Sequence, residues 1–137
     1  MAVGAAVPED AFDCDRNTFA ITGGTFVGIG GALSRPTEAA CTQHTVILGS
    51  VTKSQTLALR AVDETITFAF TIPQSYQVRR LSSPDIVTGT QYTVYAGGTA
   101  SADKRFNGLF LGSLGDASGT AGKSFTVTSC ITNLNWR

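Results

Sequence analysis

The segment TITFAFTI, residues 65–72, alternates large apolar side chains with the small side chains of threonine and alanine. Successive side chains of an extended strand point to opposite sides, so its larger apolar residues share one face: Ile66, Phe68, Phe70 and Ile72. A helix would place its apolar residues three or four positions apart. The segment therefore predicts a β-strand with one face in a hydrophobic core.

Similar alternation recurs in TLALRA (56–61), QYTVYA (91–96) and SFTVTSCI (124–131). Prolines and glycines separate most of these runs, and β-branched and aromatic residues dominate them, as is typical of strands. We find no stretch longer than about ten residues with the apolar spacing of a helix. The chain is predicted to be all-β, with antiparallel strands and hairpins forming its C-terminal part, residues 51–137.

The N-terminal part differs, because its apolar runs are short and rich in glycine. ITGGTFVGIGG (21–31) contains five glycines in eleven residues, but it lacks the third glycine of a dinucleotide-binding loop and no βαβ unit surrounds it. Two-residue corners between very short strands suit the coil of a parallel β-helix. We therefore predict β-helix rungs over residues 9–50, in which the glycines form bends.

A second glycine-rich stretch, ASGTAGKS (117–124), partly matches a phosphate-binding loop. Such a loop needs a helix after it, because the N-terminus of that helix holds the phosphate. The residues that follow have the period of a strand, so we predict a hairpin turn at this position instead.

The charge balance and the short apolar runs of the chain disfavour nucleic-acid binding and a membrane span. Ten lysine and arginine residues balance ten aspartate and glutamate residues, so the formal net charge is zero. Nucleic-acid binding needs a basic face, and no apolar run approaches the roughly 18 residues of a membrane span. The opening MAVGAAVPED lacks the basic region of a signal peptide, and residues 1–8 are expected to form an arm, a cap or a frayed terminus.

Four carboxylates gather in EDAFDCDRN (9–17). Asp13, Asp15 and Asn17 have the first three spacings of a calcium-binding EF-hand loop, but the later positions of that loop do not match. Two interpretations stay open, a calcium site of another kind and a solvated acidic turn.

The inventory of catalytic groups is poor. His44 is the single histidine, and its neighbour Cys41 would be the only nucleophile beside it. We therefore predict that the chain is not an enzyme. The three cysteines, Cys14, Cys41 and Cys130, lack the spacing of a zinc site, which leaves one disulfide with one free thiol, or three buried thiols.

Aromatic residues are the remaining candidates for ligand contacts. They can stack on the apolar faces of sugar rings, although such residues more often belong to a core. The candidates are Tyr76, Tyr92, Tyr95, Phe106, Phe110 and Trp136.

Specific phrases resemble a family of extracellular bacterial carbohydrate-binding proteins that are built as right-handed parallel β-helices. DAFDCDRNTFAITGGTFVGIGG (10–31) is similar to the terminal rungs of that family. SSPDIVTGTQYTVYAGG (82–98) resembles its C-terminal phrase, and TITFAFTIPQSYQVRRLSSP (65–84) resembles the linker between them. The resemblance spans roughly residues 9–131.

The resemblance implies a non-catalytic, secreted or cell-surface module that binds plant cell-wall polysaccharides such as cellulose or galacturonan, with calcium held by acids in the rung turns. Carried over to this chain, the calcium ligands are Asp10, Asp13 and Asp15. It also places Cys14 and Cys41 on neighbouring rungs, which favours a disulfide between them.

The chain departs from that family in length, because it has room for only about two rungs. An open first rung leaves unpaired backbone groups and apolar surface uncovered. Three explanations remain: the chain is a piece of a longer protein, residues 1–8 act as a cap, or copies stack as a homo-oligomer. Stacking gives an alternative function, a self-assembling structural subunit at the cell surface. In each case residues 1–137 are expected to form a single all-β domain.

Overall fold

The computed structural model describes residues 1–4, 9–49, 55–73, 75 and 78–134 and confirms the all-β prediction. One sheet has the strand order β1 (Ala2–Val3), β2 (Phe26–Gly30), β6 (Val78–Ser82), β3 (Thr45–Leu48) and β11 (Ile131–Asn133). The other has the order β10 (Thr120–Thr126), β7 (Gln91–Ala96), β4 (Thr56–Ala61), β5 (Ile66–Thr71), β9 (Leu109–Ala117) and β8 (Ala100–Phe106). The only helical turn in these ranges is a 3-10 turn, Glu38–Ala40, and no helix there is long and apolar enough to cross a membrane.

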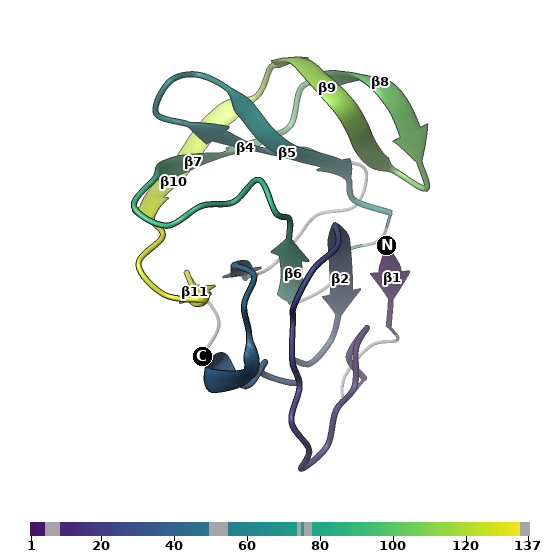
Figure 1. The fold of residues 1–137 in the computed structure, drawn as a ribbon. Coiled ribbons are helices and arrows are strands. Elements are labelled where there is room, and N and C mark those ends of the chain that lie inside the picture. The colour runs from purple at the N-terminus through teal and green to yellow at the C-terminus, as the bar shows by residue number, and fades with distance from the viewer. Residues whose placement is uncertain (5–8, 50–54, 74, 76–77, 135–137) are drawn as a thin grey trace.

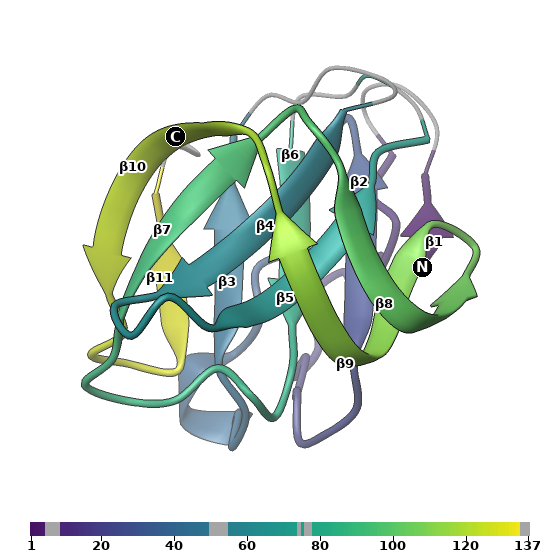
Figure 2. The same cartoon turned by 90° about the horizontal axis from the view of Figure 1, so that it is seen from above.

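The two sheets face each other and enclose the main hydrophobic core, with their strands crossing obliquely (Figures 1 and 2). Val27 and Ile29 of β2 are fully buried, and from the facing sheet Phe68, Phe70 and Ile72 join the same cluster. The predicted strand at residues 65–72 is therefore confirmed as β5, with Phe68, Phe70 and Ile72 of its predicted face in the core. Burying several large apolar side chains, each contributing about 1.5–3 kcal/mol, is the main force that holds the sheets together.

Within this strand, Ile66 is the exception to the predicted face. It packs against a second cluster on the outer side of the same sheet. The pairing of β4 with β5 shifts register between Leu59 and Arg60, and Arg60 lies opposite Ile66. A bulge of this kind changes the face to which the next side chain points.

The first sheet contains both parallel and antiparallel pairs. β6 lies between β2 and β3 and runs antiparallel to both, whereas β1 and β11 run parallel to their neighbours. In a coil of β-helix rungs, the strands of successive turns would pair directly. Because β6 occupies the space between β2 and β3, the described residues do not show the rungs expected over 9–50.

A long hairpin folded back on itself completes the other sheet. β7 continues into β8 along one arm, and β9 continues into β10 along the other, with Phe106 opposite Leu109 near the tip. Both arms bend where Gly98 meets Ser118: a Cβ at Gly98 would lie 2.6 Å from the Ser118 backbone. The half beyond the bend crosses the outer face of β4 and β5 (Figure 2). The hairpin turn predicted at ASGTAGKS is therefore wrong: residues 118–119 form the bend between β9 and β10 in one arm, residues 120–124 belong to β10, and the turn of the hairpin lies between Phe106 and Leu109.

Candidate functional site

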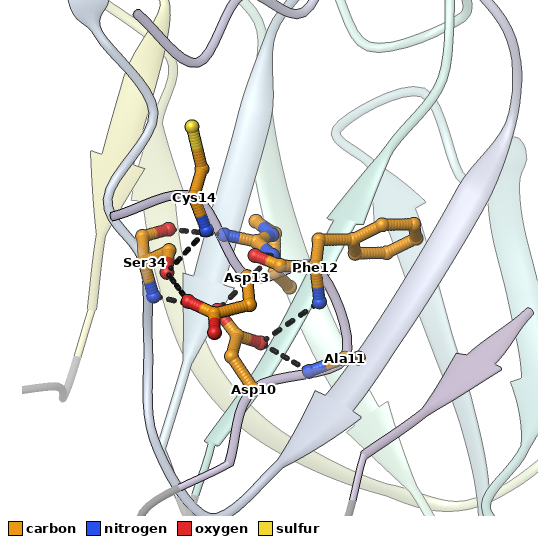
Figure 3. Close-up of polar contacts among 7 residues, drawn as sticks. Asp10, Ala11, Phe12, Asp13, Cys14 and Ser34 are labelled. Atoms are coloured by element: carbon orange, nitrogen blue, oxygen red, sulfur yellow. Dashed lines mark hydrogen bonds and ion pairs between the residues drawn. The ribbon is translucent and has the colours of Figure 1, made fainter. Parts of the chain in front are cut away.

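The acidic stretch at residues 9–17 lies against the outer face of the first sheet and contacts a buried arginine. Arg80 of β6 and Asp10 form an ion pair whose Nη2 and Oδ2 atoms are 3.3 Å apart, with side chains 1% and 6% exposed. The other carboxylate oxygen, Oδ1, accepts from the amides of Ala11 at 2.6 Å and Phe12 at 3.4 Å. Figure 3 shows this arrangement, in which Oδ2 also accepts from the amide of Ser34 at 2.5 Å.

The Arg80 guanidinium is held by several groups besides the carboxylate. Its Nη1 donates to the carbonyl oxygen of Ser34, and its Nη2 donates to that of Phe12. The guanidinium also lies over the rings of Phe12 and Phe19, 5.3 and 4.7 Å from their centres. Burial lowers the pKa of Arg80, and the charge of Asp10 acts in the opposite direction. Asp10 therefore compensates a buried charge.

Of the three acids expected to bind calcium, Asp10 and Asp13 lie together at Ser34, and Asp15 is exposed. Asp10 is committed to Arg80 and to backbone amides, and Asp13 accepts from Ser34 Oγ at 3.1 Å. No group of three or more acidic, cysteine or histidine residues that could hold a metal occurs in the described ranges. As arranged here, the set does not fit a calcium ion, which prefers six to eight converging oxygens.

The other groups singled out from the sequence have local partners. Cys14, Cys41 and Cys130 are free thiols in the structure, so the disulfide expected between Cys14 and Cys41 is not formed. Both ring nitrogens of His44 are engaged, Nδ1 with the Ser129 carbonyl oxygen at 3.1 Å and Nε2 with Thr88 Oγ1 at 2.8 Å. His44 therefore joins three segments of the chain.

A cleft opens where β9 leaves the edge of β5. These two strands share a single paired position, Phe70 with Leu109, next to a hydrogen bond from the Thr71 amide to the Gly108 carbonyl oxygen at 2.7 Å. Beyond that point β9 turns away over the outer face of the sheet with its partner β8 (Figure 2). The space between the diverging strands is a cleft of about 480 Å³.

The lining of this cleft combines apolar side chains with hydroxyl groups. Phe68 of the main core and Phe110 of the second cluster are buried residues of the lining, and three aliphatic side chains line it as well: Ile66, Leu111 and Leu114. Hydroxyl groups come from Thr25, Thr65, Thr67 and Ser83. Among the described residues of the lining, only Asp85 carries a charge, and its Oδ2 accepts from Ser83 Oγ at 3.1 Å.

The aromatic candidates fall into different environments. Tyr92 is buried in the core, Tyr95 lies beneath the Arg60 guanidinium, and Phe106 is 59% exposed at the hairpin tip. Of the candidates that the structure describes, Phe110 is the one that lines the cleft. Tyr76 and Trp136 lie outside the described residues.

The threonines of the cleft were not recognised as candidates from the sequence. In TITFAFTI the alternation marks Thr65 and Thr67 as the polar face of a strand, which is ordinarily a solvent face. Their place in a cleft follows from the path of β9, more than 40 residues later in the chain. A threonine-rich outer face was the only local signal.

Comparisons with family models, with curated proteins and with solved structures found no match for this chain.

Proposed function

We propose that this chain is a non-catalytic carbohydrate-binding module of an extracellular or cell-surface protein, and that the cleft between β5 and β9 binds the glycan. The observation that carries the proposal is the lining of that cleft. Its volume of about 480 Å³ falls within the range of small-ligand sites, roughly 300–1,000 Å³. The resemblance of the sequence phrases to extracellular glycan binders supports the same function.

The chemistry of the lining is complementary to that of a sugar. A pyranose ring presents apolar C–H faces, which can pack on Ile66, Leu111 and Leu114, and a rim of hydroxyl groups. Those hydroxyl groups can donate to the Asp85 carboxylate and exchange hydrogen bonds with the threonines. Glycoside hydrolysis ordinarily needs two facing carboxyl groups, and the described lining offers one. Binding without catalysis is the function that this lining favours.

Two loops, residues 9–19 and 31–37, lie side by side like rungs, which supports the family resemblance. The amide of Gly31 donates to the Glu9 carbonyl oxygen at 3.0 Å, and the amide of Thr37 donates to that of Phe19 at 2.9 Å. These contacts run in the same order along both loops, as they would in successive turns of a coil. We propose that the loops are reduced rungs, separated at the sheet by β6.

A matched pair of variants tests the proposed site. Immobilised cellulose, xylan and galacturonan should retain the wild-type protein, and Asp85→Ala should weaken retention about tenfold by removing a charge-assisted hydrogen bond. Asp116→Ala removes an exposed carboxylate from β9 outside the cleft and should leave retention unchanged. Equal retention of both variants would exclude the cleft, and no retention of the wild-type protein on any polysaccharide would exclude the function.

A second candidate function, self-assembly, rests on the two edges of the first sheet. β1 pairs with β2 alone and β11 with β3 alone among the described strands, and both point in the same direction. If β11 of one copy lay beside β1 of the next, the sheet would continue in the same sense and build a filament. Val3, on β1, is 41% exposed at this edge.

Two valine variants separate assembly from general surface effects. Val3→Lys puts a charge on the β1 edge and should shift any assembled species toward the monomer in light scattering after size exclusion. Val62→Lys changes a valine that is 71% exposed in the turn between β4 and β5, and should not. A wild-type protein that is monomeric at every concentration rejects assembly and leaves the glycan proposal intact.

A further inference from the structure

Two of the three cysteines meet beside the edge strand β11. The Sγ atom of Cys130 lies 3.2 Å from the backbone carbonyl oxygen of Cys41. The amide of Thr45 donates to the Cys130 carbonyl oxygen at 2.8 Å, so Cys130 lies at the start of the pairing between β3 and β11. Cys41 is buried, whereas Cys130 is partly exposed.

Cys14 lies apart from these two cysteines, in the acidic stretch at residues 9–17. Its amide donates to Ser34 Oγ at 3.0 Å, and its Sγ lies 3.8 Å from the Asn17 carbonyl oxygen. Cys41 instead lies beside Ile21, whose amide is 3.4 Å from the Cys41 Sγ. The contacts therefore place Cys130, and not Cys14, next to Cys41.

The contact between Cys130 and Cys41 bounds the distance that a disulfide would have to span. With standard bond lengths, the path from the Cys41 Cα through its carbonyl oxygen to the Sγ and Cα of Cys130 limits the separation of the two Cα atoms to about 8 Å at most. Disulfides span Cα separations of roughly 4.4–6.8 Å. A rotation of the Cys41 side chain away from Ile21 and toward Cys130 is the change that the bond requires.

We propose that Cys41 and Cys130 form a disulfide by exchange with glutathione disulfide, and that Cys14 remains a free thiol. The more accessible Cys130 thiolate attacks one glutathione sulfur and releases one reduced glutathione, which leaves a mixed disulfide. The Cys41 thiolate then attacks the Cys130 sulfur and releases the second. Two protein thiols are oxidised, one glutathione disulfide is reduced, and the thiol protons end on the two glutathione molecules.

The bond would tie the short edge strand β11 to the rest of the protein. β11 is three residues long and pairs with β3 alone among the described strands. The bond closes a loop of about 90 residues, and long loops gain the most stability from a cross-link in the chain-entropy model. We expect the oxidised protein to melt roughly 10 °C higher than the reduced protein.

Peptide mapping tests the pairing directly, because trypsin separates all three cysteines. Cleavage after Arg16, Lys53 and Lys123 leaves Cys14, Cys41 and Cys130 on three different peptides, 1–16, 17–53 and 124–137. The native protein is equilibrated in a buffer of reduced and oxidised glutathione, its free thiols are alkylated, and it is digested without reduction. We expect peptide 17–53 linked to peptide 124–137, and alkylated peptide 1–16.

Single variants serve as controls. Cys14→Ser should keep the link and the higher melting temperature, whereas Cys130→Ser should lose both. A link between peptides 1–16 and 17–53, or three alkylated thiols in the native wild-type protein, overturns the proposal. The Cys14→Ser protein keeps the test decisive even if Cys130→Ser fails to fold, because the proposal fails if its peptides 17–53 and 124–137 are not linked.

Discussion

Gly28 lies within β2, where a side chain would collide with the neighbouring acidic loop. A Cβ at this position would lie 2.7 Å from Cδ2 of the Phe12 ring, and one at Gly30 would lie 3.0 Å from the Glu9 carbonyl oxygen. These glycines let the acidic loop pack closely on the outer face of the sheet, so their role differs from the corner role expected from the sequence. Gly24, with φ +85°, does form a corner.

The first prediction concerns this close packing. Gly28→Ala should lower the free energy of unfolding by about 1–3 kcal/mol, because Phe12 also contacts Phe26 edge-on and lies under Arg80. Gly23→Ala is the matched control, since a Cβ there meets nothing within 4 Å. Urea denaturation measures both changes. Equal effects of the two substitutions would mean that the loop does not pack on β2 as described.

The second prediction concerns the buried ion pair. Asp10→Ala leaves the Arg80 guanidinium buried without its carboxylate and should cost about 3–5 kcal/mol of unfolding free energy. Asp13→Ala removes an exposed carboxylate three residues later and should cost less than about 0.5 kcal/mol. Thermal and urea denaturation report the difference, and a small loss for Asp10→Ala would contradict a structural role for the pair.

At the scale of elements, the folded-back hairpin creates the cleft, because it carries β9 away from β5 and over the sheet. Its bend requires glycine at two adjacent positions, Gly97 with φ +82° and Gly98 with φ +66°. At Gly97 a side chain would have open space, whereas at Gly98 it would collide with the opposite arm. The two positions therefore separate backbone strain from steric collision.

The third prediction uses that difference. Gly97→Ala should cost about 1–2 kcal/mol, the ordinary penalty for a side chain at positive φ. Gly98→Ala should cost at least about 2 kcal/mol more, because the Ser118 backbone must move. It should also weaken glycan binding by displacing β9. If both variants unfold at the same urea concentration, the arms do not meet at this bend.

The strands marked by local alternation are those that were predicted correctly, β4, β5 and β7 among them. The alternation over 65–72 identifies β5, and it fails at Ile66 only because a bulge depends on the register with β4. The insertion of β6 between β2 and β3 could not be predicted, since it depends on pairing between residues about 31–56 positions apart. The cleft depends in turn on where a hairpin distant in the sequence folds, and no local sequence pattern predicts that position.

At the scale of the whole molecule, the fourth prediction concerns calcium. Asp10 is committed to Arg80 and Asp15 is exposed, so calcium in place of a chelator should change the melting temperature by less than about 1 °C. Calorimetry or fluorescence-monitored melting measures this difference. An increase of several degrees that is lost in Asp13→Asn or Asp15→Asn would restore the calcium expectation of the family resemblance.

Glycan binding in the cleft is the central claim, and amide chemical-shift mapping tests it most directly in a 14.3 kDa protein. Titration with a soluble oligosaccharide of the retained polysaccharide should shift the amides of residues 65–68 and 110–114, which border the cleft on its two sides. Residues of β1 and β11, at the far edges of the other sheet, should not shift. Shifts that cluster outside the cleft, or none at saturating oligosaccharide, would contradict the proposed function.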